Sequence, residues 1–399
     1  LHKEYRRQRQ MCIRDRGMLG NERIGDNYFP YIALMSFGNS LFYMADGSVV
    51  SDKTARPAVL AVEDITWETT TSTDIGLDAN FFNNRLQFHF DYYWKQTKDM
   101  LLNIEIPYFM GYNNPSTNAG KMSTHGYDIE LAWNDRIGDF KYGVNVNFSD
   151  FLSKIDYMND GEQISGGKIK RAGVLFNEYY GYVCDGIYQT QEEVNNSART
   201  STTVTVGDLK YRDISGPDGV PDGIISPEYD RVPLGNSLPR FQYGGTFNAS
   251  YKGIDFSIAF QGIGKQNSYL STAMVQPLRD NFGNVPSILE GKYWSPFNTA
   301  EENLSAKYPR LSNVSKNNNY ATSSFWMFNG SYFRLKNLTL GYTLPETWTQ
   351  KAGINRVRFY VSGSDLFCLS NFPDGWDPEM SYKAYPITTS LVMGLQVNF

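Results

Sequence analysis

Apolar and polar side chains alternate along most of this chain. The clearest run, RLQFHFDYYWK, places Leu86, Phe88, Phe90, Tyr92 and Trp94 on one face of an extended strand and the intervening residues on the other. The closing run, LVMGLQVNF, has the same period. Such runs predict an all-β fold with strands over 71–81, 86–95, 124–134, 140–151, 239–251, 254–262, 331–343, 356–367 and 387–399.

The phase of the alternation changes once, within SYFRLKNLTLGYTL. Phe333 and Leu335 occupy odd positions, whereas Leu338 and the apolar residues that follow occupy even ones. A β-bulge near Lys336 and Asn337 restores a common apolar face, because one extra residue reverses the alternation. We therefore predict a bulge there.

The connections between these strands alternate in length. The short ones are 82–85, 135–139, 252–253 and 344–355, and the long ones are 96–123, 152–238, 263–330 and 368–386. In a meander this places all short turns at one end of the sheet and all long loops at the other. Antiparallel transmembrane β-barrels of bacterial outer membranes have this asymmetry, with short periplasmic turns and long extracellular loops. By this parity the last strand runs inward and leaves Phe399 on the periplasmic side.

A soluble β-sandwich or propeller also alternates apolar and polar faces. Two observations favour the membrane barrel: alternation continues for about ten residues in several strands, as a membrane strand needs, and aromatic residues lie near strand ends. These are Tyr92, Tyr93, Trp94 and Trp133, which are typical of an interfacial girdle.

Composition excludes several other classes. The net charge of −5 provides no global attraction for nucleic acid. Cys12, Cys184 and Cys368 are too few and too scattered for a disulfide framework or a four-ligand zinc site. The mean hydropathy is −0.44, and no run approaches the roughly 20 apolar residues of a spanning helix.

The first residues differ from the rest. The segment LHKEYRRQRQMCIRDRG is basic, lacks the apolar core of a secretion signal and has no strand periodicity, so we treat residues 1–17 as doubtful and of non-native character. The region 28–50 is predicted to add one or two weaker strands. Nine strands is an odd number for a single-chain barrel, and we expect further strands upstream of residue 1.

From about residue 21 to Phe399 the chain resembles the SusC/RagA family of TonB-dependent outer-membrane transporters. The similar blocks, in the family's order, are DITWETTTSTDIGLDANFFNNRLQFHFDYYWKQTKDML, NAGKMSTHGYDIEL, YYGYVCDGIY, GDLKYRDISGPDGVPDGIISPEYDRVPLGNSLPRFQYG, SYFRLKNLTLGYTLP and GWDPEM. The resemblance implies that residues 18–399 are the C-terminal part of a barrel of about 22 strands. It also implies import of oligosaccharides or peptides with energy passed through TonB, under a SusD-like surface lipoprotein.

The resemblance further implies a plug domain and a TonB-contacting segment, and neither is recognisable in this sequence. We expect both to lie outside it. A passive porin or structural barrel without energy coupling is the alternative, and upstream sequence discriminates between them. The partners expected are outer-membrane lipid, the SusD-like lipoprotein, TonB and the substrate.

The segment DISGPDGVPDGIISPEYD spaces acidic side chains among glycines. Asp213, Ser215, Asp218, Asp222 and Asp230, with Glu228, offer the oxygen ligands that calcium takes on a flexible turn. Pro217 interrupts the EF-hand-like spacing, and the twelfth-position carboxylate is unclear. The alternatives are a calcium site and a solvated loop rich in Asx turns. No other cofactor is expected.

Aromatic residues in the long loops are candidates for stacking on substrate. They are Tyr179, Tyr180, Tyr182, Trp294 and Trp326, and the alternative is that they pack the loops against one another. Arg334 and Lys336 are expected to line the lumen or to pair with plug carboxylates.

An enzymatic function is not expected. His89 and His125 are expected on polar faces of separate strands, where a barrel hydrolase is conceivable, but no nucleophile motif accompanies them.

Overall fold

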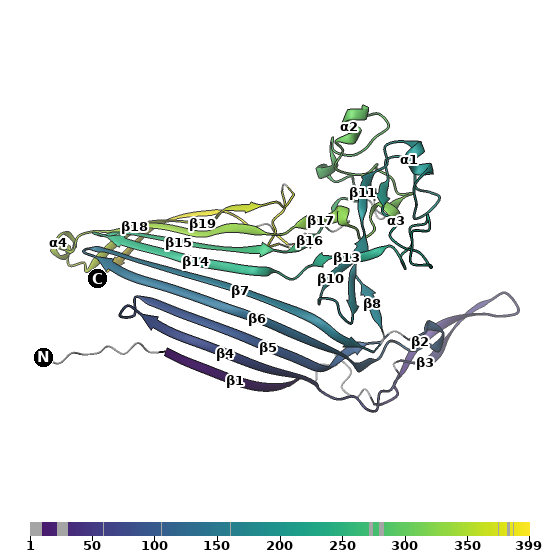
Figure 1. The fold of residues 1–399 in the computed structure, drawn as a ribbon, viewed down its shortest axis with the longest axis horizontal. Coiled ribbons are helices and arrows are strands. Elements are labelled where there is room, and N and C mark those ends of the chain that lie inside the picture. The colour runs from purple at the N-terminus through teal and green to yellow at the C-terminus, as the bar shows by residue number, and fades with distance from the viewer. Residues whose placement is uncertain are drawn as a thin grey trace.

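A curved antiparallel sheet dominates the computed structural model, which describes residues 10–21, 31–58, 60–104, 106–159, 161–270, 274–278, 283–373, 375–380, 384–385 and 387–399 (Figure 1). The sheet has ten strands in the order β1-β4-β5-β6-β7-β14-β15-β18-β19-β20. Their bounds are Gln10–Asn21 (β1), Glu68–Phe81 (β4), Leu86–Asn103 (β5), Ser116–Ile137 (β6), Phe140–Met158 (β7), Arg240–Tyr251 (β14), Ile254–Lys265 (β15), Tyr332–Thr343 (β18), Arg356–Ser370 (β19) and Ser390–Asn398 (β20).

The predicted all-β class and all nine predicted strands are confirmed, as β4 to β7, β14, β15 and β18 to β20. β5 ends later than predicted, at Asn103, and β6 begins earlier than predicted, at Ser116. Much of the expected long loop 96–123 is therefore strand. The apolar alternation stops near Trp94, whereas backbone pairing continues beyond it, and that is why the sequence pattern placed the strand ends too early.

The predicted bulge is present in β18. Ala259 of β15 pairs with Asn337 and the next residue, Phe260, pairs with Leu335, so the ladder skips Lys336. The extra residue keeps the apolar side chains on both sides of the bulge on one face.

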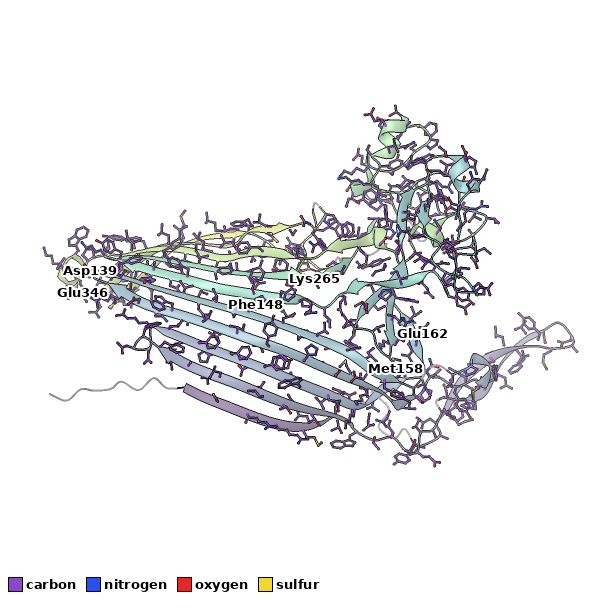
Figure 2. The ribbon with its side chains drawn as sticks, viewed as in Figure 1. Asp139, Phe148, Met158, Glu162, Lys265 and Glu346 are labelled. Atoms are coloured by element: carbon purple, nitrogen blue, oxygen red, sulfur yellow. The ribbon has the colours of Figure 1, made fainter. Side chains whose placement is uncertain are left out.

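Short turns gather at one end of the sheet and long segments at the other. Figure 2 shows Asp139 and Glu346 at the short-turn end, with Met158 and Glu162 at the opposite end. The tightest turn is Lys252–Gly253, whose φ values of 43° and 88° are both positive, as two-residue hairpin turns of the favoured hand require. The predicted alternation of connection lengths is confirmed except at the first long connection, because 104–115 is no longer than the short connection 344–355.

The sheet has one apolar and one polar face. Because directly paired residues share a face, the register aligns apolar residues in rows across the strands. One row runs Ala79, Phe88, Leu131, Val146, Gly245, Phe260 and Leu335. Many side chains on this face are exposed, including Leu340 at 51% and Met393 at 75%, and none of the described segments forms a second layer over it. The sandwich alternative is therefore wrong.

Aromatic side chains bound this apolar band. Near the short turns, the ring of Trp133 lies 6.0 Å from that of Phe82, and its Nε1 donates to the Tyr142 hydroxyl at 3.4 Å. At the other side Trp94 packs edge-on against Tyr92. The distance along β5 from Leu86, the residue that pairs with Trp133, to Trp94 is about 26 Å. Such a band matches the apolar belt of an outer-membrane barrel.

Tyr93 does not belong to the girdle. It pairs with Asp74 and Gly126 on the polar face. The girdle prediction for Tyr93 is therefore wrong, because neighbouring residues of a strand point to opposite faces.

Two N-terminal segments differ from expectation. Of the doubtful residues 1–17, residues 10–17 lie in β1, which pairs with β4 along the edge of the sheet; their non-native character stays a prediction. Of the one or two weaker strands predicted within 28–50, one appears as Met35–Tyr43 (β2), and a second, Val49–Pro57 (β3), begins at the end of that region and lies mostly beyond it; 28–30 lie outside the described residues. β2 and β3 form a separate two-stranded hairpin that projects away from the sheet (Figure 1).

The remaining elements lie in the long segments and in one turn. The strands are Glu162–Ser165 (β8), Lys168–Arg171 (β9), Glu178–Tyr182 (β10), Cys184–Ile187 (β11), Leu209–Tyr211 (β12), Arg231–Asn236 (β13), Asn267–Tyr269 (β16) and Met327–Asn329 (β17). The helices are Gln191–Asn195 (α1), Ala300–Leu304 (α2), Lys316–Asn319 (α3) and Glu346–Thr349 (α4), with 3-10 turns Tyr108–Met110 (η1), Ser287–Leu289 (η3), Ser324–Trp326 (η4) and Gln350–Ala352 (η5). Within the described chain, every helix is too short and too polar to cross a membrane.

Candidate functional site

The two longest connections pack together into one body beyond the end of the sheet (Figure 1). We call it the loop body; it comprises the described residues of 159–239 and 266–331. Its core draws from both connections: Tyr182, Leu209, Tyr211, Ile225, Leu270, Val275, Leu289, Tyr308 and Trp326. Burial of these large side chains gives the loop body a hydrophobic core separate from the sheet.

A buried polar network joins the two halves of the loop body. Asp208, with no exposed surface, accepts from Arg310 Nε at 2.7 Å, from Ser315 Oγ at 2.7 Å and from Asn319 Nδ2 at 2.9 Å. The backbone N–H of Thr205 also donates to it, at 2.9 Å. A buried carboxylate persists only when it is paired and hydrogen-bonded, so this network fixes one half against the other.

The aromatic residues predicted to stack on substrate lie mostly inside the loop body. Tyr180, Tyr182 and Trp294 are 7%, 8% and 9% exposed. Tyr179 is partly exposed and packs 5.9 Å from the ring of Tyr269. Burial raises the pKa of Tyr179 and Tyr182 above the ordinary phenol value. These side chains pack the loops in this structure, and their contact with substrate stays a prediction.

The acidic loop is ordered by hydrogen bonds from its own backbone. Asp230 is fully buried, and its two carboxylate oxygens accept from the N–H groups of Ile214 and Ser226 at 2.8 and 2.7 Å. Asp213 Oδ2 accepts from Gly223 N–H at 2.7 Å, while its Oδ1 is buried without a hydrogen-bond partner.

The other predicted ligands stand further out. Asp222 closes an Asx turn onto Ile224 N–H at 2.9 Å, and Asp218 is exposed. In the described part of the chain no three His, Cys, Asp or Glu side chains gather as a metal site would require. The hydrogen-bonding accounts for the loop's order, and calcium stays a prediction.

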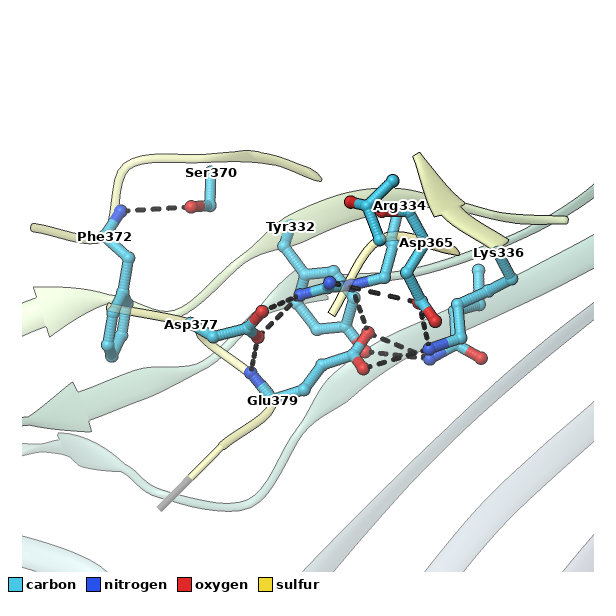
Figure 3. Close-up of polar contacts among 10 residues, drawn as sticks. Tyr332, Arg334, Lys336, Asp365, Ser370, Phe372, Asp377 and Glu379 are labelled. Carbon is cyan, nitrogen blue, oxygen red and sulfur yellow. Dashed lines mark hydrogen bonds and ion pairs between the residues drawn. The ribbon is translucent and has the colours of Figure 1, made fainter. Parts of the chain in front are cut away.

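Arg334 organises a cluster of charges on the polar face of the sheet (Figure 3). It is 3% exposed; its Nη2 donates to both oxygens of Asp377 at 2.5 Å, and its Nε donates to Glu379 Oε1 at 3.0 Å. Lys336 Nζ lies 2.8 Å from Asp365 and 3.3 Å from Glu379. The segment between β19 and β20 is thereby held against the inner face of the wall.

Arg334 and Lys336 were predicted to line the lumen or to pair with plug carboxylates, and their partners in this structure were not predicted. Asp377 and Glu379 belong to the block GWDPEM, and Asp365 lies on β19. Two loop carboxylates separated by one residue are a weak signal for a buried ion pair, since such charges are usually solvated. Only the fold brings the loop back over β18.

The two histidines cannot share a site. His89 lies on the polar face with its Nδ1 2.6 Å from Asp78. His125 pairs with Trp94 and lies on the opposite, apolar face, so its predicted polar placement is wrong. His125 has the same parity as Tyr127 and Ile129, which lie on the apolar face, so the sequence already contained the signal for its placement.

Comparison with known proteins identifies the family. The model of the TonB dependent receptor-like β-barrel matches residues 23–362. The chain belongs to this family. TonB-dependent receptor P3 of Formosa agariphila is 29% identical over 96% of the chain and 38% of that receptor, and TonB-dependent receptor SusC of Bacteroides thetaiotaomicron is 26% identical over 96% and 37%. The predicted SusC/RagA resemblance is confirmed.

A solved structure shows the same fold. The RagAB peptide transporter superposes with a TM-score of 0.74 at 23% identity, over 98% of this chain and 41% of the matched one. The chain spans 35% to 39% of the length of the curated relatives it matches. It therefore corresponds to the barrel part of such a receptor, and the relatives' names describe receptors rather than enzymes.

Proposed function

We propose that this chain forms the C-terminal wall of a TonB-dependent importer in the outer membrane of a Gram-negative bacterium, with its C-terminus on the periplasmic side. The importer takes up oligosaccharides or peptides together with a SusD-like surface lipoprotein, and it is not an enzyme. The family match over 23–362, joined to an open apolar face that extends about 26 Å along a strand, carries the proposal.

Energy-coupled import is preferred to a passive pore because of the polar face. The segment from Asp377 to Glu379 is held against the wall by Arg334, so part of the lumenal face is covered by an internal segment, which supports gated import. A passive porin needs a continuous aqueous path, whereas an importer opens only when its internal segments move.

Uptake in the native host tests the proposal. We expect cells that lack this reading frame to lose uptake of a labelled peptide or oligosaccharide pool, and cells that lack TonB to show the same loss. Uptake that needs this protein but continues without TonB and after collapse of the proton gradient supports the passive porin instead. Affinity purification of the tagged protein from the outer membrane, with the SusD-like lipoprotein as the expected partner, tests the assembly.

A further inference from the structure

A cavity of about 450 Å³ lies where the loop body meets the segment that follows β19. Its walls are aromatic: Phe325 and Phe328 come from the loop body, and Phe372 comes from the segment after β19. The rings of Phe328 and Phe372 are 6.3 Å apart, and Phe325 packs edge-on against the buried Trp326 at 4.8 Å. Two chain segments far apart in sequence therefore build one pocket, in which three phenyl rings stand beside the polar side chains of Tyr308 and Asn371.

Two lysines stand at this pocket. The backbone carbonyl of Lys292 accepts from the N–H groups of Lys307 and Tyr308 at 2.9 and 3.1 Å, so the two lysines occupy adjoining strands of backbone. Both are exposed, and among the described residues neither has a carboxylate partner. Two lysine side chains at one pocket, with no carboxylate partner, favour the binding of an anion there.

We propose that this pocket binds the C-terminal residue of a short peptide, with an apolar side chain among the phenyl rings and the terminal carboxylate between Lys292 and Lys307. The assignment rests on the proposed import function and specifies its substrate class. An acidic sugar also carries a carboxylate, but its hydroxyl groups need several polar partners. Tyr308 and Asn371 are the neutral polar side chains of the lining, whereas the rings of Phe325, Phe328 and Phe372 suit an apolar side chain.

Arg334 acts on this pocket as a positioning residue. Phe372 and Pro373 line the cavity, and the same segment continues to Asp377 and Glu379, which Arg334 holds. The charge cluster on the sheet thereby fixes the position of Phe372 and Pro373, which form one side of the pocket.

The test compares two forms of one peptide on the purified full-length protein. Isothermal titration uses a hexapeptide that ends in phenylalanine, once with a free C-terminal carboxylate and once as the C-terminal amide. We expect the amide to bind at least about tenfold more weakly, because charge-assisted hydrogen bonds are the strong ones. The double variant Lys292→Gln/Lys307→Gln is expected to bind both forms equally and as weakly as the wild type binds the amide.

Matched variants separate the pocket from general effects. Lys351→Gln, at the short-turn end of the sheet, is expected to retain the preference for the free carboxylate. Phe372→Ala is expected to weaken both peptide forms together, since it removes the apolar wall rather than the charge. Arg334→Gln is expected to do the same through displacement of that wall, and Arg334→Lys to restore part of the affinity.

Equal binding of the two peptide forms by the wild type, or no binding of either, overturns the assignment. So does binding of a uronate oligosaccharide that depends on both lysines while the peptides fail to compete. Import and binding are measured separately: TonB-dependent uptake without a carboxylate preference sinks only the pocket assignment. A carboxylate preference in a protein that supports no TonB-dependent uptake sinks only the transport proposal.

Discussion

Arg334 and Asp377 are 43 residues apart in sequence, and both oxygens of the Asp377 carboxylate lie 2.5 Å from one guanidinium nitrogen. The arginine is on β18 and the aspartate is in the connection between β19 and β20. The pair lies on the polar face of the wall, where the Arg334 side chain is 3% exposed and the Asp377 side chain is 20% exposed. It attaches the connection between β19 and β20 to β18.

Asp377→Ala tests the strength of this attachment. Removal of one partner leaves a buried arginine with less compensation, and we expect a loss of about 3 kcal/mol in the free energy of unfolding. Thermal unfolding in detergent measures it, and limited proteolysis is expected to cut within 371–389 faster than in the wild type. Glu162→Ala, which breaks the exposed pair with Arg171, is the control and is expected to cost about 1 kcal/mol or less.

Asp208→Ala tests the network inside the loop body. Arg310, Ser315 and Asn319 lose their shared acceptor, so the two halves of the loop body are expected to open more often. Hydrogen exchange should accelerate at least about a hundredfold at 315–320 and remain unchanged in β5 and β6. Asp185→Ala, at an exposed ion pair of the same loop body, is expected to change exchange little; similar effects from both variants contradict the network's role.

The apolar face predicts an asymmetry between neighbouring residues. Ile129 pairs with Phe90 and Phe148 in the middle of the apolar band, and Glu130 faces the polar side. Ile129→Arg is expected to destabilise the membrane-inserted protein by about 2–4 kcal/mol, because the charge meets lipid. Glu130→Arg inserts the same group on the other face and is expected to cost much less. Equal costs in urea titrations from liposomes contradict the assignment of the faces.

Calcium removal decides between the two alternatives for the acidic loop. If the loop binds calcium, titration of calcium into the chelator-treated protein releases or absorbs heat, and calcium protects 213–230 from hydrogen exchange. Both effects are then lost in Asp213→Asn. If the loop is only a hydrogen-bonded turn, none of these effects occurs, because backbone N–H groups that donate to Asp230 already hold the loop in place. Magnesium serves as the control cation, because it demands a stricter octahedral geometry.

Cys184 is expected to react slowly with alkylating reagents near neutral pH. Burial is the main cause that raises the pKa of its thiol to about 11, so little thiolate is present at pH 8. In the variant Cys12→Ser/Cys368→Ser, the iodoacetamide rate should rise about tenfold per pH unit up to that pKa. A rate that levels off near pH 9 contradicts the burial of this side chain.

The sequence by itself determined the wall. Alternation is a local property with a period of two residues, so it located β4 to β7, β14, β15 and β18 to β20, and it required the bulge at Lys336. Connection lengths fixed which ends lie together. The motifs indicated the family because their order along the chain is a property of the sequence and does not depend on how the chain folds.

Only the tertiary structure decided what the long connections do. It buried Tyr182 and Trp294 inside the loop body, paired β1 with β4, and brought Asp377 and Glu379 onto Arg334. Lys292, Lys307 and Phe372 likewise meet at one pocket only after folding. These are contacts between residues remote in sequence, set by the packing of irregular backbone, and no short-range period records them.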